Sequence, residues 1–207
     1  MMDDMSNYSK LVFLIGCLCI FATVSLAGCV NTSATSTVDS ANEVVNSMNH
    51  YIENQKSFDN MVGKNIDFWN AHINSGDKTY YAFMKVGINN ELKAIDGLQT
   101  DLEDADNKII DFSGQTVNLN GNVKTYADQS LTKMRLWQSN MEEYCNSMSA
   151  YAQDRRSYLN SVEAGYPDDT LLASMNNAKN KALSAITKAN DARSDMNDLL
   201  KKIEKLQ

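Results

Sequence analysis

Four aromatic residues at heptad spacing, with an arginine in the neighbouring row, form the most chemically suggestive pattern in this sequence. Trp137, Tyr144, Tyr151 and Tyr158 recur every seven residues. A row of methionines runs three residues ahead of them and continues in Arg155 and Val162. Such a row can form an adaptable ligand groove, in which the arginine would hold an anionic ligand. The same spacing is typical of a coiled-coil core seam, in which Arg155 would pair with an acidic residue or extend its charge to the rim. The core seam is the commoner meaning, and both interpretations stay open here.

Metal, haem and nucleophile chemistry would each require a spacing that the sequence lacks. A di-metal site in a helical bundle uses Glu-x-x-His, but Ser47 and Trp69 stand three residues before His50 and His72. No CxxCH signature, phosphate-binding glycine loop or GxSxG motif occurs in the 207 residues. We therefore expect no metal, no cofactor and no enzymatic activity, and both histidines as partly exposed helix residues.

A cysteine follows the apolar run at the start of the chain. The run from Leu11 to Ala27 is shorter than the roughly 20 residues that a transmembrane helix needs and is typical of an export signal. Leu26-Ala27-Gly28-Cys29 at its end resembles the lipobox of prokaryotic lipoproteins. The resemblance covers residues 1–29 only, and no family resemblance extends to the rest of the chain.

The lipobox resemblance implies a location. In lipoproteins the cysteine thiol receives the lipid and cleavage makes that cysteine the first residue. Residues 1–28 would then be a signal peptide, Cys29 the lipid attachment site, and the remaining chain would lie on the extracytoplasmic face of the cell membrane. The alternative is an uncleaved N-terminal transmembrane anchor, which also places the remainder outside the cytoplasm. The lipid type and the use of Asn31, the start of an Asn-x-Ser/Thr sequence, stay open.

The first ten residues depart from the usual export signal, whereas the other cysteines fit a lipoprotein. The segment MMDDMSNYSK is more acidic than an export signal usually is, and a start at Met5 would remove both aspartates. Cys17 and Cys19 lie in the part that would be discarded. We expect Cys145 to be a small buried hydrophobic residue rather than a reactive thiol.

The composition favours long helices and disfavours nucleic-acid binding. The chain has one proline, nine glycines and a net charge of −7. Acidic and basic residues are mixed along each expected helix, whereas nucleic-acid binding requires a basic stripe. We therefore expect an all-α protein that does not bind nucleic acid.

Apolar stripes at helical spacing predict four helices after a flexible tether at residues 29–37. The expected bundle covers residues 38–207, and the helices are expected at residues 38–74, 78–112, 123–164 and 168–206. The first expected stripe includes Val45 and Ile52, and Ser40 to Glu43 are expected to form a capping box that opens the first helix. The stripe of the last helix alternates intervals of four and three residues, which is a coiled-coil period. The fold predicted is an elongated antiparallel four-helix bundle, or a pair of coiled-coil hairpins.

These features favour a structural role over a catalytic one. We expect a lipid-anchored helical scaffold that offers a rigid face to a protein partner. The alternative is a small-ligand-binding, sensor-like four-helix module that acts through a partner. The uneven stripe around Gln55 and Asp59 also leaves room for a homodimer.

Overall fold

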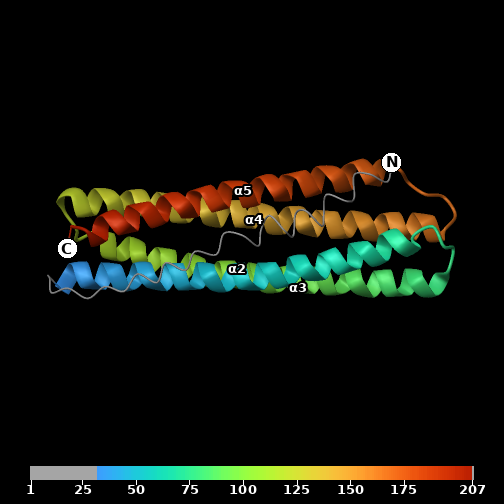
Figure 1. Ribbon diagram of the computed structural model, residues 1–207, viewed down its shortest axis with the longest axis horizontal. Coiled ribbons are helices and arrows are strands. Elements are labelled where there is room, and N and C mark those ends of the chain that lie inside the picture. The colour runs from blue at the N-terminus through green and yellow to red at the C-terminus, as the bar shows by residue number, and fades with distance from the viewer. Residues whose placement is uncertain (1–31, 207) are drawn as a thin grey trace. The chain divides into compact units, whose positions relative to one another are not determined.

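The computed structural model describes residues 32–206, which form four long α-helices (Figure 1). The helices are α2 (Thr32–His72), α3 (Lys78–Thr116), α4 (Gly121–Glu163) and α5 (Thr170–Glu204). No β-strand occurs among the described residues. The prediction of an all-α four-helix bundle is therefore confirmed.

The chain divides into two compact units, and each unit takes one segment from every helix. Among the described residues, unit 1 contains residues 52–98 and 145–182. Unit 2 contains residues 32–51, 99–144 and 183–206. Each unit therefore has its own set of four packed helix segments.

Polar contacts show the helix directions within each unit. In unit 1, Lys85 and Glu91 of α3 contact Glu163 and Arg155 of α4, so residue numbers rise along one helix as they fall along the other. The same inverse order relates α2 and α3 in unit 2, through the pairs Ser36–Gln115, Glu43–Lys108 and Ser47–Asp104. In unit 1 α3 and α4 are therefore antiparallel, and in unit 2 α2 and α3 are antiparallel, as predicted.

The breaks predicted near residues 74–77 and 165–168 form tight turns. Gly76 and Gly165 have φ of +72° and +82°, a region that favours glycine. At the end of α4 the amides of Gly165 and Tyr166 donate to the carbonyls of Val162 and Ser161, both at 3.0 Å. This pair of bonds is the Schellman arrangement, which satisfies carbonyls that the helix leaves open.

An aspartate caps the helix after each of these two turns. The Asp77 carboxylate accepts a hydrogen bond from the Thr79 amide at 2.8 Å, and Asp168 accepts one from the Thr170 amide at 3.0 Å. Both carboxylates satisfy a backbone donor in the first turn, which α-helices leave without an intrahelical partner.

The first helix begins earlier than predicted. α2 starts at Thr32, so residues 32–37 are helical rather than a tether, and Ser40 to Glu43 lie inside the helix rather than at its start. α3 is also longer than predicted and ends at Thr116. The two extensions pack on each other, because Ser36 donates to the Gln115 side chain at 3.1 Å. Packing between neighbours thus outweighs the weak helix propensity of a Ser/Thr-rich segment.

The cores follow the predicted stripes with a shift in α2. Val44 and Tyr51 are fully buried, whereas the expected Val45 and Ile52 are only partly buried. The buried positions of α2 run through Gln55, which continues the alternation of three and four residues. Gln55 and Asp59, which make the apolar stripe of α2 uneven, are therefore buried polar residues within a continuous row of core positions.

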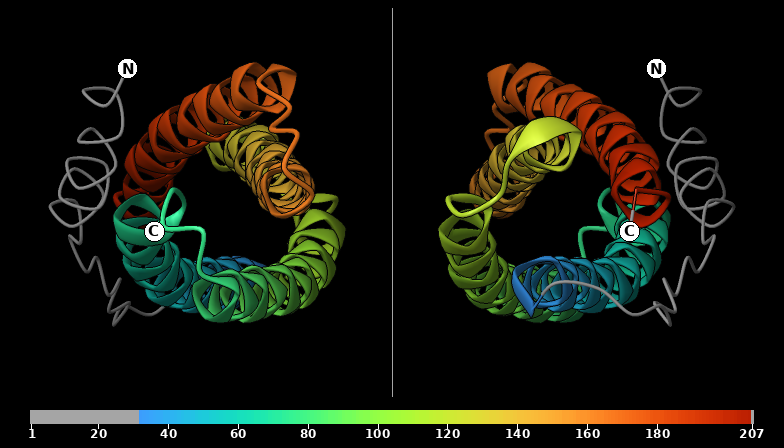
Figure 2. Two further views of the ribbon diagram at one scale, coloured as in Figure 1. Left: turned by 90° about the vertical axis from the view of Figure 1, so that its right-hand side faces the viewer. Right: turned by 90° about the vertical axis from the view of Figure 1, so that its left-hand side faces the viewer.

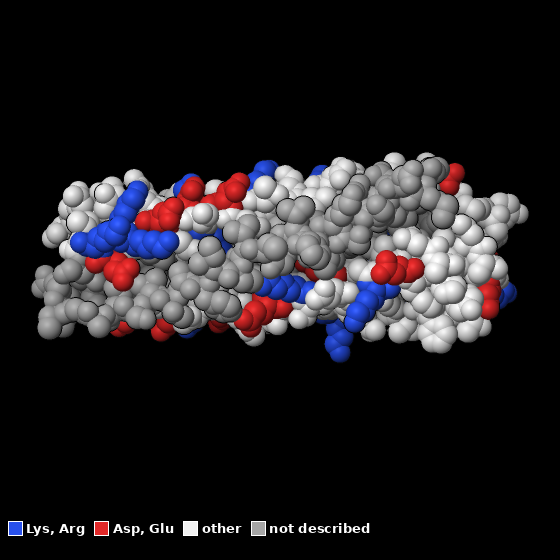
Figure 3. Space-filling model, in the orientation of Figure 1, with Lys and Arg blue, Asp and Glu red and all other residues white. Residues whose placement is uncertain are grey.

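No helix among residues 32–206 combines the length and apolar character needed to cross a membrane. The charged residues visible on the described surface in Figure 3 are intermixed, with lysines and arginines beside acidic residues.

Candidate functional site

Arg155, the arginine of the aromatic seam, forms a buried ion pair with Glu91. Arg155 of α4 and Glu91 of α3 are 2% and 1% exposed. The Arg155 Nη1 donates to both carboxylate oxygens of Glu91, at 3.0 and 2.9 Å. The Glu91 carboxylate therefore neutralises the positive charge of Arg155, which would otherwise require an anionic ligand.

Aromatic rings enclose the guanidinium of Arg155. Its Cζ lies 5.1 Å from the ring centroid of Trp69 and 5.5 Å from that of Tyr151. Both distances lie within the range of a cation–π interaction, which is strongest when the cation is removed from water. The rings shield the ion pair and compensate part of its desolvation cost.

Asn65 completes the network on the other side of Glu91. Its Nδ2 donates to Glu91 Oε1 at 2.8 Å and to the Gly87 carbonyl at 3.3 Å. A Cβ at Gly87 would lie 3.1 Å from the Asn65 Cγ, so the absence of a side chain there allows this approach. The carboxylate of Glu91 thus receives hydrogen bonds from two helices.

The polar network uses two positions, one helical turn apart, on each of three helices. The pairs are Asn65 and Trp69 on α2, Gly87 and Glu91 on α3, and Tyr151 and Arg155 on α4. Residues four apart lie on the same face of a helix. Three inward faces thus meet at this level of unit 1.

The chemistry available to this network is limited. Burial raises the pKa of the Tyr151 phenol above its ordinary value of 10.0, Arg155 opposes that shift, and Glu91 adds to it. Tyr151 therefore stays neutral at physiological pH. The Arg155 Nε has no hydrogen-bond partner among the described residues, so the guanidinium is bonded on only part of its edge.

The predicted seam residues are divided between the two units. Trp137 and Tyr144 lie in the core of unit 2, where Tyr51 packs edge-on against Trp137 at 5.5 Å between ring centroids. Tyr151 is buried in unit 1, whereas Tyr158 is only partly buried and lies 6.2 Å from the Trp69 ring. The aromatic residues of the seam therefore contribute to the cores of both units.

Glu91 was missed in the sequence, although a signal for it exists. The buried positions of α3 alternate by three and four residues, and Glu91 occupies one of them. The full set is Tyr81, Met84, Ile88, Glu91, Ile95, Leu98, Leu102, Ala105, Ile109, Phe112 and Thr116. An acidic residue at a core position pairs naturally with an arginine at another. Treating heptad position separately from hydrophobicity would have marked Glu91 as a candidate partner of Arg155.

A cluster of aromatic side chains also lies on the outside of the α2–α3 hairpin in unit 1. His72 stacks on Tyr80 at 4.0 Å, and Phe68 lies 4.6 Å from His72. Phe83 is 6.4 Å from Phe68 and 60% exposed, and Val86 beside it is 55% exposed. We refer to these five residues as the aromatic face.

Cavities in unit 2 are small or wide open. An apolar crevice of about 20 Å³ between α2, α3 and α5 has room for about one water molecule. A polar depression of about 400 Å³ beside Lys133 and Asp195 is open to solvent. No group of three or more metal-ligating side chains occurs among the described residues.

The structure describes Cys145 and both histidines of the sequence analysis, but not Cys29 or Asn31. Cys145 is buried. His50 is exposed and its Nε2 lies 3.6 Å from Asp101 Oδ1, and His72 is partly buried in the aromatic face. Cys29 and Asn31 lie outside the described residues. Neither a protein-family model nor a curated protein nor a solved structure matches this chain.

Proposed function

We propose that this chain is an extracytoplasmic lipoprotein whose helical bundle acts as a non-enzymatic scaffold that contacts a protein partner. The location rests on Leu26-Ala27-Gly28-Cys29, which resembles a lipobox and follows an apolar run. Stable lipid anchoring requires two acyl chains or their equivalent, because one chain gives marginal binding.

The pairing of Arg155 with Glu91 carries the scaffold proposal. An anionic ligand was one possible partner of Arg155, but a carboxylate of the chain already occupies that position, 2.9 Å from the arginine Nη1. Of the aromatic rings that would have lined a groove, Tyr151 packs on the guanidinium of Arg155 and Trp137 packs on the ring of Tyr51. A closed core favours a role for the outer surface.

The aromatic face supports protein contact. Aromatic residues are enriched in protein–protein interfaces, and contiguous exposed apolar residues mark such sites. Phe83 and Val86 are more than half exposed on adjacent turns of α3. The face lies at the C-terminal end of α2, whereas Cys29 precedes the N-terminal end of the same helix.

A photo-crosslinking amino acid placed at Phe83 in the native host tests this role. We expect one adduct of defined mass from position 83 and none from position 136, since Leu136 is exposed but isolated from the aromatic face. The absence of an adduct at position 83 would contradict the proposed partner contact.

Thermal unfolding with candidate amino acids and organic acids separates the scaffold from the ligand-binding module. A ligand present at 100 times its Kd would stabilise the fold by about 2.7 kcal/mol. We expect no shift across the panel, and a clear shift with any member would favour the sensor-like alternative.

A further inference from the structure

One end of unit 2 brings together the start of α2, the α3–α4 connection and the end of α5. Ser36 of α2 bonds to Gln115 of α3. Lys202 of α5 lies over the ring of Tyr126 of α4 at 5.6 Å. Figure 2, right, shows this end toward the viewer, with the start of α2 in blue and the end of α5 in red.

Exposed apolar side chains are present at this end. Val117 in the α3–α4 connection is 70% exposed, the largest fraction among the exposed aliphatic residues described, and Leu119 two residues later is partly buried. Leu206, just after α5, is 48% exposed. We refer to Val117, Leu119 and Leu206 as the apolar tip.

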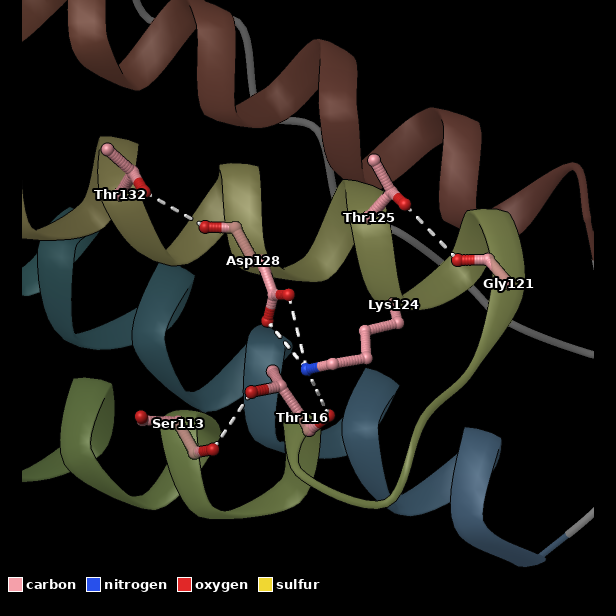
Figure 4. A network of polar contacts seen from close by, with 7 residues as sticks. All are labelled: Ser113, Thr116, Gly121, Lys124, Thr125, Asp128 and Thr132. Atoms are coloured by element: carbon pink, nitrogen blue, oxygen red, sulfur yellow. Dashed lines mark hydrogen bonds and ion pairs between the residues drawn. The ribbon is translucent and has the colours of Figure 1, made fainter.

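The α3–α4 connection that carries Val117 and Leu119 is held in place by polar contacts (Figure 4). Lys124 Nζ donates to the Thr116 carbonyl at 3.4 Å and pairs with Asp128 at 3.2 Å. The Thr116 hydroxyl donates to the Ser113 carbonyl at 2.9 Å. The connection is thus tied to both helices, and its apolar side chains remain outside the core.

The length of chain between the lipid site and α2 limits how far this end can lie from the membrane. Only Val30 and Asn31 separate Cys29 from Thr32, the first residue of α2. Three residue steps span at most about 11 Å when fully extended. A lipid on Cys29 would therefore hold the start of α2, and the apolar tip beside it, close to the bilayer surface.

We propose that the apolar tip is a membrane-contact site, which inserts into the interfacial region of the bilayer that carries the lipid anchor. This inference rests on the proposed lipidation of Cys29. Apolar side chains at an interface sit about 5–10 Å deep, at the boundary of headgroups and acyl chains. Lys124, Lys202 and Tyr126 flank the tip, and Lys and Tyr are residues that anchor proteins at this depth.

Neutral insertion explains the composition of the tip better than attraction to anionic headgroups does. Lys124 is paired with Asp128 and Lys201 with Asp198. Glu204 stands between Lys202 and Lys205 in the sequence, so carboxylates offset most of the cations near the tip. Contact through Val117, Leu119 and Leu206 does not need a net positive charge. The orientation of unit 2 on the membrane would then be defined by a lipid and a loop.

Depth-dependent fluorescence quenching on the full lipidated chain tests the contact. Val117→Cys and Leu206→Cys chains are labelled with an environment-sensitive dye and reconstituted into vesicles of phosphatidylethanolamine and phosphatidylglycerol with brominated acyl chains. Leu136→Cys, an exposed apolar position in the middle of α4, is the matched control. The unsubstituted chain corrects for any labelling of the buried Cys145.

We expect quenching at positions 117 and 206 at least about twofold stronger than at position 136, because only the tip would reach the acyl-chain boundary. The intact mass of each sample is measured first. A lipidated chain with equal quenching at all three positions would overturn the membrane contact and leave the anchor standing. A chain without lipid would overturn the proposed anchor and, with it, this inference.

Discussion

The two units differ in the buried charge that they contain: among the described residues, the buried charged side chains, Asp59, Glu91 and Arg155, all lie in unit 1. Unit 1 encloses an ion pair between Glu91 and Arg155 that also binds Asn65, so its polar contacts join three helices. Unit 2 buries the hydroxyls of Thr116 and Ser130, which donate to carbonyls of their own helices at 2.9 and 2.8 Å. The helix register of unit 1 is therefore specified by directional bonds.

Packing dominates the core of unit 2. Its large buried aromatic residues include Trp137, Tyr144 and Tyr51, and the buried stripe of α5 combines alanines with Ile186, Met196 and Ile203. The small buried residues of α5 in unit 2 are Ala185, Ala189 and Ala192. Alternation of large and small side chains fills a core without polar contacts.

Glu91→Ala should produce the largest effect. Removing one partner of a buried pair leaves an uncompensated charge, which costs about 3–5 kcal/mol. Chemical denaturation measures this change in the free energy of unfolding. Ser130→Ala in unit 2 is the matched control and should cost no more than about 1 kcal/mol.

A double substitution separates loss of the pair from loss of packing. Glu91→Leu combined with Arg155→Met removes both charges and keeps an apolar core, a change that is often neutral. We expect the double variant to be more stable than either single variant. Purely additive destabilisation would show that the two side chains do not interact.

Ala189→Leu should destabilise unit 2 by about 1–3 kcal/mol, because extra methylene groups overfill a packed core. Ala189 is fully buried, whereas the adjacent Lys188 is exposed. Lys188→Leu should therefore change stability by less than about 0.5 kcal/mol. Equal effects at the two positions would show that this seam is not closely packed.

Two glycines of α3 allow a comparison of smaller effects on stability. Gly97→Ala should stabilise the protein by about 1 kcal/mol, since alanine is the better helix former and nothing lies within 4 Å of the added Cβ. Gly87→Ala should bring no such gain, because its Cβ would press on Asn65 and disturb the bond to Glu91. Equal stabilisation by both variants, measured by thermal unfolding, would argue against a tight approach at Gly87.

The smallest expected effect concerns the ionisation of Tyr151 and changes the unfolding free energy only at alkaline pH. The folded-state pKa of Tyr151 is raised by burial, so the unfolded chain ionises first as the pH rises past about 10. The stability contributed by neutral Tyr151 is complete below that pH and is lost as the pH rises through the folded pKa. Tyr151→Phe should lessen the alkaline fall in unfolding free energy, whereas substitution of the exposed Tyr166 should leave it unchanged.

Periodicity alone was enough to predict the helices and most of the core. The four stripes identify the elements because burial of one face repeats with the helical turn. The heptads of α4 and α5 placed Trp137, Tyr144, Ala182 and Met196 correctly in the core. Helix ends were less accurate, since the start of α2 and the end of α3 pack on each other through Ser36 and Gln115, a contact that local propensity does not reveal.

The partner of Arg155 was harder to predict. The sequence raised the need for an acidic residue, but many acids lie on the helix surfaces and hydrophobicity gives no weight to Glu91. Identifying it requires the pairing of α3 with α4, which is a tertiary property. Likewise, the aromatic face arises because Phe68 and Phe83, on two different helices, come together at the hairpin.

Native mass spectrometry of the chain, extracted gently from its own membranes, tests the tethered scaffold most directly. We expect a mass that begins at Cys29 and includes lipid, without a discrete small-molecule adduct. A chain that retains residues 1–28 would contradict the lipid anchor. A stoichiometric small adduct would contradict the closed-core scaffold and favour a ligand-binding module.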